Sequence, residues 1–180
     1  MLTKQEIRIK NKKIRSKLNI NVISEKIISN LFKTQEFINA NNVFTYISFG
    51  NEIDTSKILQ LKNKKIYVPK IINSSMFFTK YDKNTLIKNK FGIYEPIDGY
   101  PNTPNEHDIV IIPALAADKT FNRVGYGGGF YDKYLRDIQC LKIILIPDVL
   151  LEKNIPHETH DIKSDMIITE NQILLNKINS

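Results

Sequence analysis

The chain has 180 residues, which is long enough for one domain with a substantial hydrophobic core. Its 42% hydrophobic and 25% charged residues are ordinary for a globular protein. No apolar run approaches the roughly 20 residues of a membrane span, and the charged N-terminus lacks the apolar segment of a secretory signal. The single cysteine, Cys140, excludes an internal disulfide and a cysteine-cluster metal site, so we expect a cytoplasmic protein.

The net charge of +7 is concentrated at the N-terminus. Residues 1–17 contain seven basic residues against one acidic residue, whereas the rest of the chain has 19 basic and 18 acidic residues. No aromatic residue precedes Phe32, although single-stranded nucleic acids bind on aromatic platforms. The basic N-terminus therefore indicates a local function rather than a surface for nucleic acid, and an RNA-binding module is only the non-enzymatic alternative.

The apolar pattern predicts helices that alternate with strands. Thr3 and Glu6 have the spacing of a capping box, and Asn21 is placed to cap a second helix. The expected helices cover about residues 4–18, 21–38, 55–62 and 131–138. In the first of them we expect Ile7, Ile14 and Leu18 to face the core. The expected strands cover residues 43–48, 65–70, 76–81, 108–113, 141–146 and 166–169.

This alternation predicts an α/β protein. We expect a three-layer α/β/α sandwich with a mostly parallel central sheet, in which residues 1–180 form a single domain. Residues 109–112 are an unbroken run of Ile and Val, which is typical of a strand buried on both faces. The loop-rich segment 82–107 is either a plain connection or a wall or lid over a substrate.

A glycine-rich segment, residues 123–132, carries the strongest signal for a ligand site. It reads Arg-Val-Gly-Tyr-Gly-Gly-Gly-Phe-Tyr-Asp and holds four of the seven glycines. A strand, then glycines, then a helix start can hold phosphate on backbone N–H groups. The segment is not a P-loop, since Phe130 follows the last glycine where Lys and Ser or Thr are required, and it lies too late in the chain for a Rossmann fingerprint.

Other candidate residues lie far from this segment in the sequence. Lys4 and Arg8 share one face of the first helix and can grip adjacent phosphates, although a solvated basic face fits the spacing too. Glu52 follows a strand, where α/β proteins bind ligands, but an ordinary loop carboxylate is an equal alternative. Asp132 can cap a helix or, with Asp161, hold Mg²⁺ beside phosphates. His157 and His160 have too few partners nearby for a zinc site.

Four separated segments resemble the 5-formyltetrahydrofolate cyclo-ligase family. The most specific is residues 112–135, from Ile112-Pro113-Ala114-Leu115-Ala116-Ala117-Asp118 to the glycine segment and Lys133-Tyr134-Leu135. The segments Lys4-Gln5-Glu6-Ile7-Arg8, Glu52-Ile53-Asp54-Thr55 and His160-Asp161-Ile162-Lys163-Ser164-Asp165 match in type and order. Some relatives carry a basic residue where this chain has Gly128, so more of the phosphate charge rests here on Arg123 and the first helix.

The resemblance implies ATP-dependent closure of 5-formyltetrahydrofolate to 5,10-methenyltetrahydrofolate, with Mg²⁺, by a protein that we expect to be a monomer. By position, ATP would contact Lys4, Gln5, Glu6, Ile7, Arg8, Arg123, Val124, Gly125, Tyr126, Gly127, Gly128, Gly129, Phe130 and Tyr131. The folate would contact Ile47, Glu52, Tyr126, Gly127, Gly128, Gly129 and Phe130. Arg123, Lys4 and Arg8 would be catalytic, and Asp132 and Asp161 would hold the metal. A sugar-phosphate isomerase or an acyl-CoA-handling protein of similar fold is the enzymatic alternative.

Overall fold

The computed structural model describes residues 2–89 and 92–176. Its centre is a seven-stranded sheet in the order β12-β11-β9-β6-β1-β2-β3. The five inner strands are parallel, and the two edge strands, β12 and β3, are antiparallel to their neighbours. The strands are β1 (Asn42–Phe44), β2 (Lys65–Ile72), β3 (Ser75–Lys80), β6 (Ile109–Ile112), β9 (Leu141–Leu145), β11 (Met166–Ile168) and β12 (Ile173–Leu175). The predicted mostly parallel sheet is confirmed.

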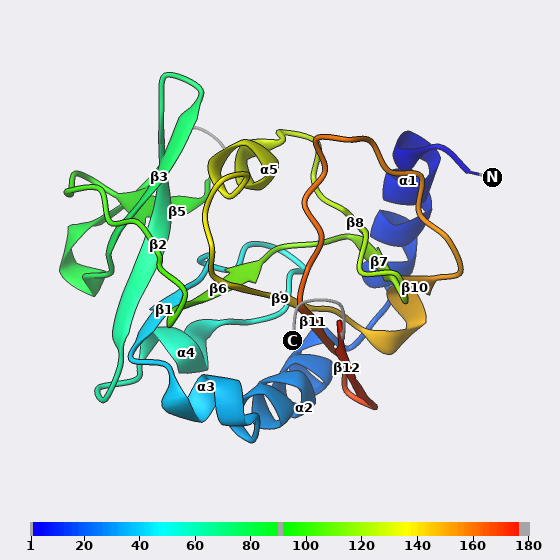
Figure 1. Ribbon diagram of the computed structural model, residues 1–180, viewed down its shortest axis with the longest axis horizontal. Helices are drawn as coiled ribbons and strands as arrows, with labels where there is room; N and C mark the ends of the chain where they lie inside the picture. Colours follow the sequence, from blue (N-terminus) through cyan, green and yellow to red (C-terminus); the bar gives the residue numbers. More distant parts are fainter. Residues whose placement is uncertain (1, 90–91, 177–180) are drawn as a thin grey trace.

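Alternate residues of the inner strands build two hydrophobic layers, one on each face of the sheet. Val43, Ile109 and Ile111 pack against α2 (Ile20–Phe32), α3 (Gln35–Asn39) and α4 (Ser56–Leu59). Phe44 and Val110, on the opposite face, pack against α5 (Phe130–Tyr134). Figure 1 shows α2, α3 and α4 on one side of the sheet and α5 on the other, so the three-layer α/β/α arrangement is confirmed.

The first helix, α1 (Lys4–Arg15), lies beside a second, smaller sheet (Figure 1). That sheet has the order β10-β7-β8 and is formed by β7 (Ala116–Asp118), β8 (Arg123–Val124) and β10 (Leu151–Glu152). A hairpin of β4 (Leu86–Lys88) and β5 (Tyr94–Pro96) completes the strands, and two short 3₁₀ helices cover Lys83–Thr85 and Asp148–Leu150. The sequence pattern did not reveal the small sheet, because its strands have only two or three residues.

Several predicted boundaries are wrong, each for a local reason. The predicted helix 21–38 is two helices, because the Thr34 hydroxyl accepts a hydrogen bond from Phe37 N and caps α3. Asn19, not Asn21, caps α2 by accepting a bond from Val22 N. The helix expected over 131–138 is only five residues long. The predicted capping box of Thr3 and Glu6 is confirmed.

The first helix also buries a different face from the one expected. Its buried residues are Ile7, Asn11 and Arg15, two of which are polar, while Ile14 is only partly buried and Leu18 lies beyond the end of the helix. An apolar pattern cannot identify a face that docks through hydrogen bonds. Separately, none of the helices within residues 2–89 and 92–176 has the length and apolar character of a membrane span.

Candidate active site

A cavity of about 860 Å³ lies where the parallel strands β1 and β6 end and their connecting loops begin. Ligands of open α/β sheets bind at this carboxyl edge. Sixteen of the eighteen residues predicted for the site line it: Lys4, Gln5, Arg8, Ile47, Glu52, Arg123, Val124, Gly125, Tyr126, Gly127, Gly128, Gly129, Phe130, Tyr131, Asp132 and Asp161. Segments from four distant parts of the chain therefore meet around one space.

Glu6 and Ile7 do not line this cavity. The Glu6 carboxylate accepts bonds from the backbone N–H and hydroxyl of Thr3, which completes the capping box at the exposed start of α1. Ile7 is 1% exposed and packs with Ala116, Val124 and Ile155. These two residues support the helix from which Lys4 and Arg8 reach the cavity.

The helix α1 is attached to the rest of the protein by a polar stripe. Positions 4, 8, 11 and 15 share one helical face, since they follow the three- and four-residue spacing of neighbouring turns. Arg8 Nε donates to Gly125 O at 2.9 Å, Asn11 Nδ2 to Leu115 O at 3.1 Å, and an Arg15 amino group to Ala114 O at 2.8 Å. These bonds bring the N-terminus against the glycine segment.

The same contacts draw part of the basic N-terminus away from the surface. Lys4 and Arg8 line the cavity, Arg15 is 4% exposed, and Lys10 forms an ion pair with Glu152 at 2.9 Å. An electrostatic footprint for nucleic acid needs cations gathered on an accessible face. Lys4 and Arg8 instead face the cavity and Arg15 the interior, whereas Lys10 is exposed and paired with Glu152.

The glycine segment bends tightly under the cavity. Gly127 has φ of 109° and Gly129 has φ of 64°, backbone conformations that residues with a side chain rarely adopt. A Cβ on Gly128 would lie 2.6 Å from the Phe130 ring. Because α5 is only one turn and a half long, its dipole is a small source of positive charge compared with Lys4, Arg8 and Arg123, which line the same cavity.

Arg123 is held by a buried network at the floor of the cavity. Its guanidinium donates to Ile162 O at 2.9 Å and forms an ion pair with Asp132 Oδ1 at 3.0 Å. The same Asp132 oxygen accepts a bond from Ile162 N at 3.1 Å. The side chain of Arg123 is 5% exposed, and its Nε has no hydrogen-bond partner within the described part of the chain. These contacts connect the loop after β10 to the glycine segment.

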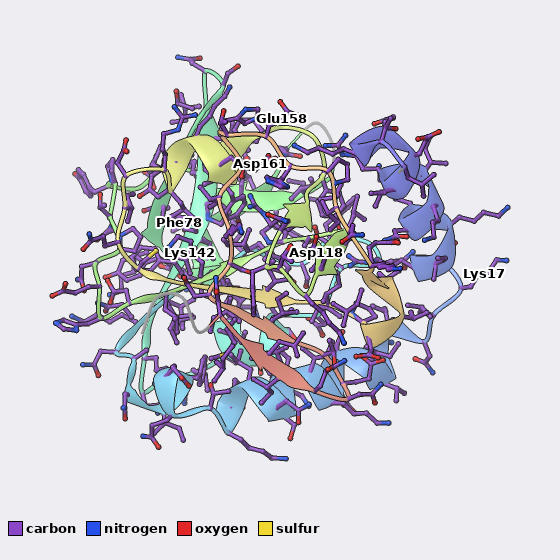
Figure 2. The ribbon with its side chains drawn as sticks, turned by 45° about the vertical axis from the view of Figure 1, so that its right-hand side comes forward. Lys17, Phe78, Asp118, Lys142, Glu158 and Asp161 are labelled. Atoms are coloured by element: carbon purple, nitrogen blue, oxygen red, sulfur yellow. The ribbon has the colours of Figure 1, made fainter. Side chains whose placement is uncertain are left out.

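Lys4 joins the start of α1 to the same loop. Its ammonium lies 2.6 Å from Asp161 Oδ2 and 3.1 Å from Glu158 Oε1. Partial burial would lower the pKa of Lys4, but the hydrogen bonds to Asp161 and Glu158 raise it. Partial burial would raise the pKa of Asp161, yet the Lys4 ammonium holds it below its ordinary value. Figure 2 shows Glu158 and Asp161 near each other on this loop.

Glu52 occupies another part of the cavity wall, in the loop after β1. One of its carboxylate oxygens accepts a bond from Phe49 N at 2.9 Å, and the Tyr126 side chain is a further hydrogen-bond partner. Burial raises the pKa of Glu52, while these hydrogen bonds and the positive charge of Arg15 oppose the increase. An acceptor held in a partly dry cavity suits recognition of ligand N–H groups.

Sequence reasoning missed some of the residues around the cavity. Tyr46 lines it directly after β1, and Arg15 supports it from behind Tyr126. The spacing of Lys4, Arg8 and Arg15 along one helical face was the available signal for Arg15. The segment expected to be a connection, wall or lid is a wall, since Asn89 and Ile93 to Glu95 line the cavity, while residues 90 and 91 lie outside the described residues.

The two predicted metal ligands are chemically suited to Mg²⁺. Asp132 and Asp161 line the same cavity, and Mg²⁺ typically takes one or two carboxylates together with phosphate oxygens. The bonds of Asp132 to Arg123 and Ile162 N use Oδ1, and those of Asp161 to Lys4 and Glu158 N use Oδ2. Among residues 2–89 and 92–176, no three His, Cys, Asp or Glu side chains are grouped to hold a metal by themselves. A metal here would therefore depend on ligand oxygens as well.

Fold and cavity together define an α/β protein with a cation-lined ligand site at the carboxyl edge of its parallel strands. Residues 2–170 match the model of the 5-formyltetrahydrofolate cyclo-ligase family. The chain belongs to this family.

Individual relatives agree with the family match. The chain is 33% identical over 174 residues to 5-formyltetrahydrofolate cyclo-ligase of Haemophilus influenzae, covering 88% of this chain and 93% of that protein. It is 28% identical over 146 residues to the Escherichia coli K12 protein of the same name, covering 74% and 80%. The solved structure of Aquifex aeolicus 5,10-methenyltetrahydrofolate synthetase is similar with a TM-score of 0.87 at 28% identity, covering 98% of this chain and 94% of that chain.

Proposed function

We propose that this protein catalyses the ATP-dependent cyclisation of 5-formyltetrahydrofolate to 5,10-methenyltetrahydrofolate, with release of ADP and phosphate. Membership of the cyclo-ligase family supports the reaction. The observation that carries the assignment of the site is that Lys4, Gln5 and Arg8 meet Glu52 and residues 123–132 around one cavity. We further propose that the enzyme acts as a cytoplasmic monomer.

In this proposal the cavity holds both substrates side by side. Lys4, Gln5, Arg8 and the segment from Arg123 to Tyr131 contact ATP, with the cations facing its phosphates. Ile47, Glu52 and the segment from Tyr126 to Phe130 contact the folate. The glycine segment lies between the two, since it belongs to both sets of contacts. Glu52 accepts hydrogen bonds from N–H groups of the pterin.

The chemistry requires positioning and charge neutralisation rather than a covalent nucleophile on the protein. The formyl oxygen attacks the γ-phosphorus of ATP, and ADP leaves. N10 of the folate then attacks the formyl carbon, and its proton goes to solvent. The phosphate departs with the former formyl oxygen and leaves the methenyl cation. Lys4, Arg8 and Arg123 stabilise the negative charge that moves onto phosphate oxygens during these steps.

We also propose that Asp132 and Asp161 hold Mg²⁺ with the phosphates of ATP. When bound there, the ion would supply positive charge beside the phosphate oxygens. Arg123 and Ile162 N keep Asp132 oriented toward the cavity, while Lys4 and Glu158 N do so for Asp161. A triphosphate that draws the Lys4 ammonium toward itself weakens the ion pair and leaves Asp161 to the metal.

The assay is direct because the methenyl product has its own absorbance. Purified protein is mixed with 5-formyltetrahydrofolate, Mg²⁺ and ATP, and the methenyl chromophore is followed with time. We expect product in step with ADP, and none without ATP. Absence of product with every nucleoside triphosphate tested would reject the proposed function. Product formed without ATP would reject the phosphorylation step.

A further inference from the structure

A buried arginine, a tyrosine and a glutamate from three separate parts of the chain form a continuous polar connection to the cavity. Arg15, at the end of α1, donates to the Tyr126 hydroxyl at 3.1 Å, and the two residues are 111 positions apart in the chain. The Tyr126 side chain in turn is a hydrogen-bond partner of Glu52. Glu52 and Tyr126 line the cavity, whereas Arg15 lies behind them.

The direction of this connection follows from donor and acceptor chemistry. A guanidinium can only donate, so the Tyr126 oxygen must accept the bond from Arg15. The single hydroxyl proton of Tyr126 is then directed to its other partner. An ionised carboxylate can only accept, so Glu52 receives that proton as a hydrogen bond. The carboxylate of Glu52 also accepts a hydrogen bond from Phe49 N at 2.9 Å.

The positive charge of Arg15 is buried with no adjacent carboxylate among the described residues. The residue is 4% exposed, yet no carboxylate of the described residues forms an ion pair with it within 4.0 Å. A buried cation is costly unless an opposite charge balances it. The carboxylate whose ionised form it favours is Glu52, on the far side of the Tyr126 hydroxyl. A neutral side chain would dock α1 with less cost, as Asn11 does one helical turn earlier.

We infer that Arg15 is a positioning residue for folate binding, which acts through the Tyr126 hydroxyl to hold the Glu52 carboxylate in one orientation. This inference rests on the proposed function, since it takes Glu52 as the group that binds the pterin. It assigns to the far end of α1 a role in the folate half of the cavity, while Lys4 and Arg8 at its near end serve ATP.

The surroundings of Glu52 are consistent with this role. Burial raises the pKa of Glu52, whereas Phe49 N, the Tyr126 hydroxyl and the Arg15 charge lower it. Tyr46 and Tyr131 also face this group, and burial raises the pKa of each phenol well above its ordinary value, so both stay neutral. Among these groups Arg15 is the one cation, and its removal should make Glu52 protonate at a higher pH.

The test compares Arg15 with Asn11, which attaches the same helix to the neighbouring carbonyl without touching Tyr126. Arg15→Met, Arg15→Lys, Tyr126→Phe and Asn11→Ala are assayed for KM with each substrate, for kcat and for thermal stability. In Arg15→Met and Tyr126→Phe we expect the KM for 5-formyltetrahydrofolate to rise about tenfold or more, and in Arg15→Met the KM for ATP should stay within about twofold. Arg15→Lys should recover part of the loss.

Two further measurements distinguish a positioning role of Arg15 from a purely structural one. In Arg15→Met, the pH below which folate affinity declines should move upward, and the double variant with Tyr126→Phe should be no worse than the poorer single variant. Asn11→Ala should lower stability without changing the folate KM. Equal changes in both KM values, or a stability loss alone as in Asn11→Ala, would overturn the inference. If Arg15→Met does not fold, an unchanged folate KM in Tyr126→Phe overturns it as well. Failure of the proposed function is distinguishable, since the unaltered enzyme would then form no methenyl product.

Discussion

The ammonium of Lys4 lies 2.6 Å from a carboxylate oxygen of Asp161, 157 residues further along the chain. Their side chains are 18% and 16% exposed, so solvent screens this pair less than a surface ion pair. The contact joins the start of α1 to the loop that leads to β11. A triphosphate in the cavity would compete with Asp161 for the ammonium.

We predict that Lys4→Met raises the KM for ATP by about tenfold or more, since a hydrogen bond to a charged group is worth roughly 1.5–3 kcal/mol. The KM for the folate should change little. Steady-state kinetics of methenyl formation measures both values. Lys10→Met is the matched control, because Lys10 pairs with Glu152 outside the cavity and should leave ATP binding intact. The same ATP KM in both variants would contradict a phosphate contact for Lys4.

Asp132→Asn tests the proposed metal site, because it removes charge and keeps the shape of the side chain. We expect the Mg²⁺ concentration for half-maximal activity to rise about tenfold or more. Titration of Mg²⁺ at fixed ATP measures this change. Asp137→Asn is the control, since Asp137 is exposed and follows the end of α5. An unchanged Mg²⁺ requirement in Asp132→Asn would contradict the proposed metal site. Asp132 would then serve only as the ion-pair partner of Arg123.

The folate KM should depend on pH through Glu52. Burial raises the pKa of this carboxyl, so it protonates at a higher pH than an ordinary glutamate as the solution is acidified. A protonated carboxyl loses an acceptor for pterin N–H groups, so we expect the folate KM to rise as pH falls through that raised pKa. Glu52→Gln should have a high folate KM at every pH and lose this dependence. If the folate KM of Glu52→Gln rises at low pH as it does in the unaltered enzyme, the titrating group is not Glu52.

The buried carboxylate of Asp118 should be important for stability rather than for catalysis. It is 1% exposed and accepts bonds from Thr120 N at 2.9 Å, Asn122 N at 3.1 Å and Ile155 N at 2.8 Å. Asp118→Ala leaves these N–H groups unsatisfied, and we expect a loss of roughly 3 kcal/mol or more in the free energy of unfolding. Urea unfolding measures it. Asp137→Ala, at an exposed site, should change stability by less than about 0.5 kcal/mol.

The strands and the glycine segment were predictable because their signals are local. The apolar runs that became β6 and β9 identified buried parallel strands, and four glycines within ten residues identified a close-approach site. Helix ends were less predictable, since Asn19 and Asn21 are both suitable caps and only packing decides between them. The strands of the small sheet, two or three residues each, are too short for a periodic pattern.

The sequence by itself determined the α/β class and the parallel sheet, and it supplied the residues that we propose for ligand binding. The tertiary structure decided which of them share a cavity: Lys4 and Arg8 meet the glycine segment, while Glu6 and Ile7 face elsewhere. It also decided that α1 docks through Arg8, Asn11 and Arg15. The reason is physical, because periodicity records local burial of apolar groups, whereas these hydrogen bonds join residues 99 to 117 positions apart and exist only once the chain has folded.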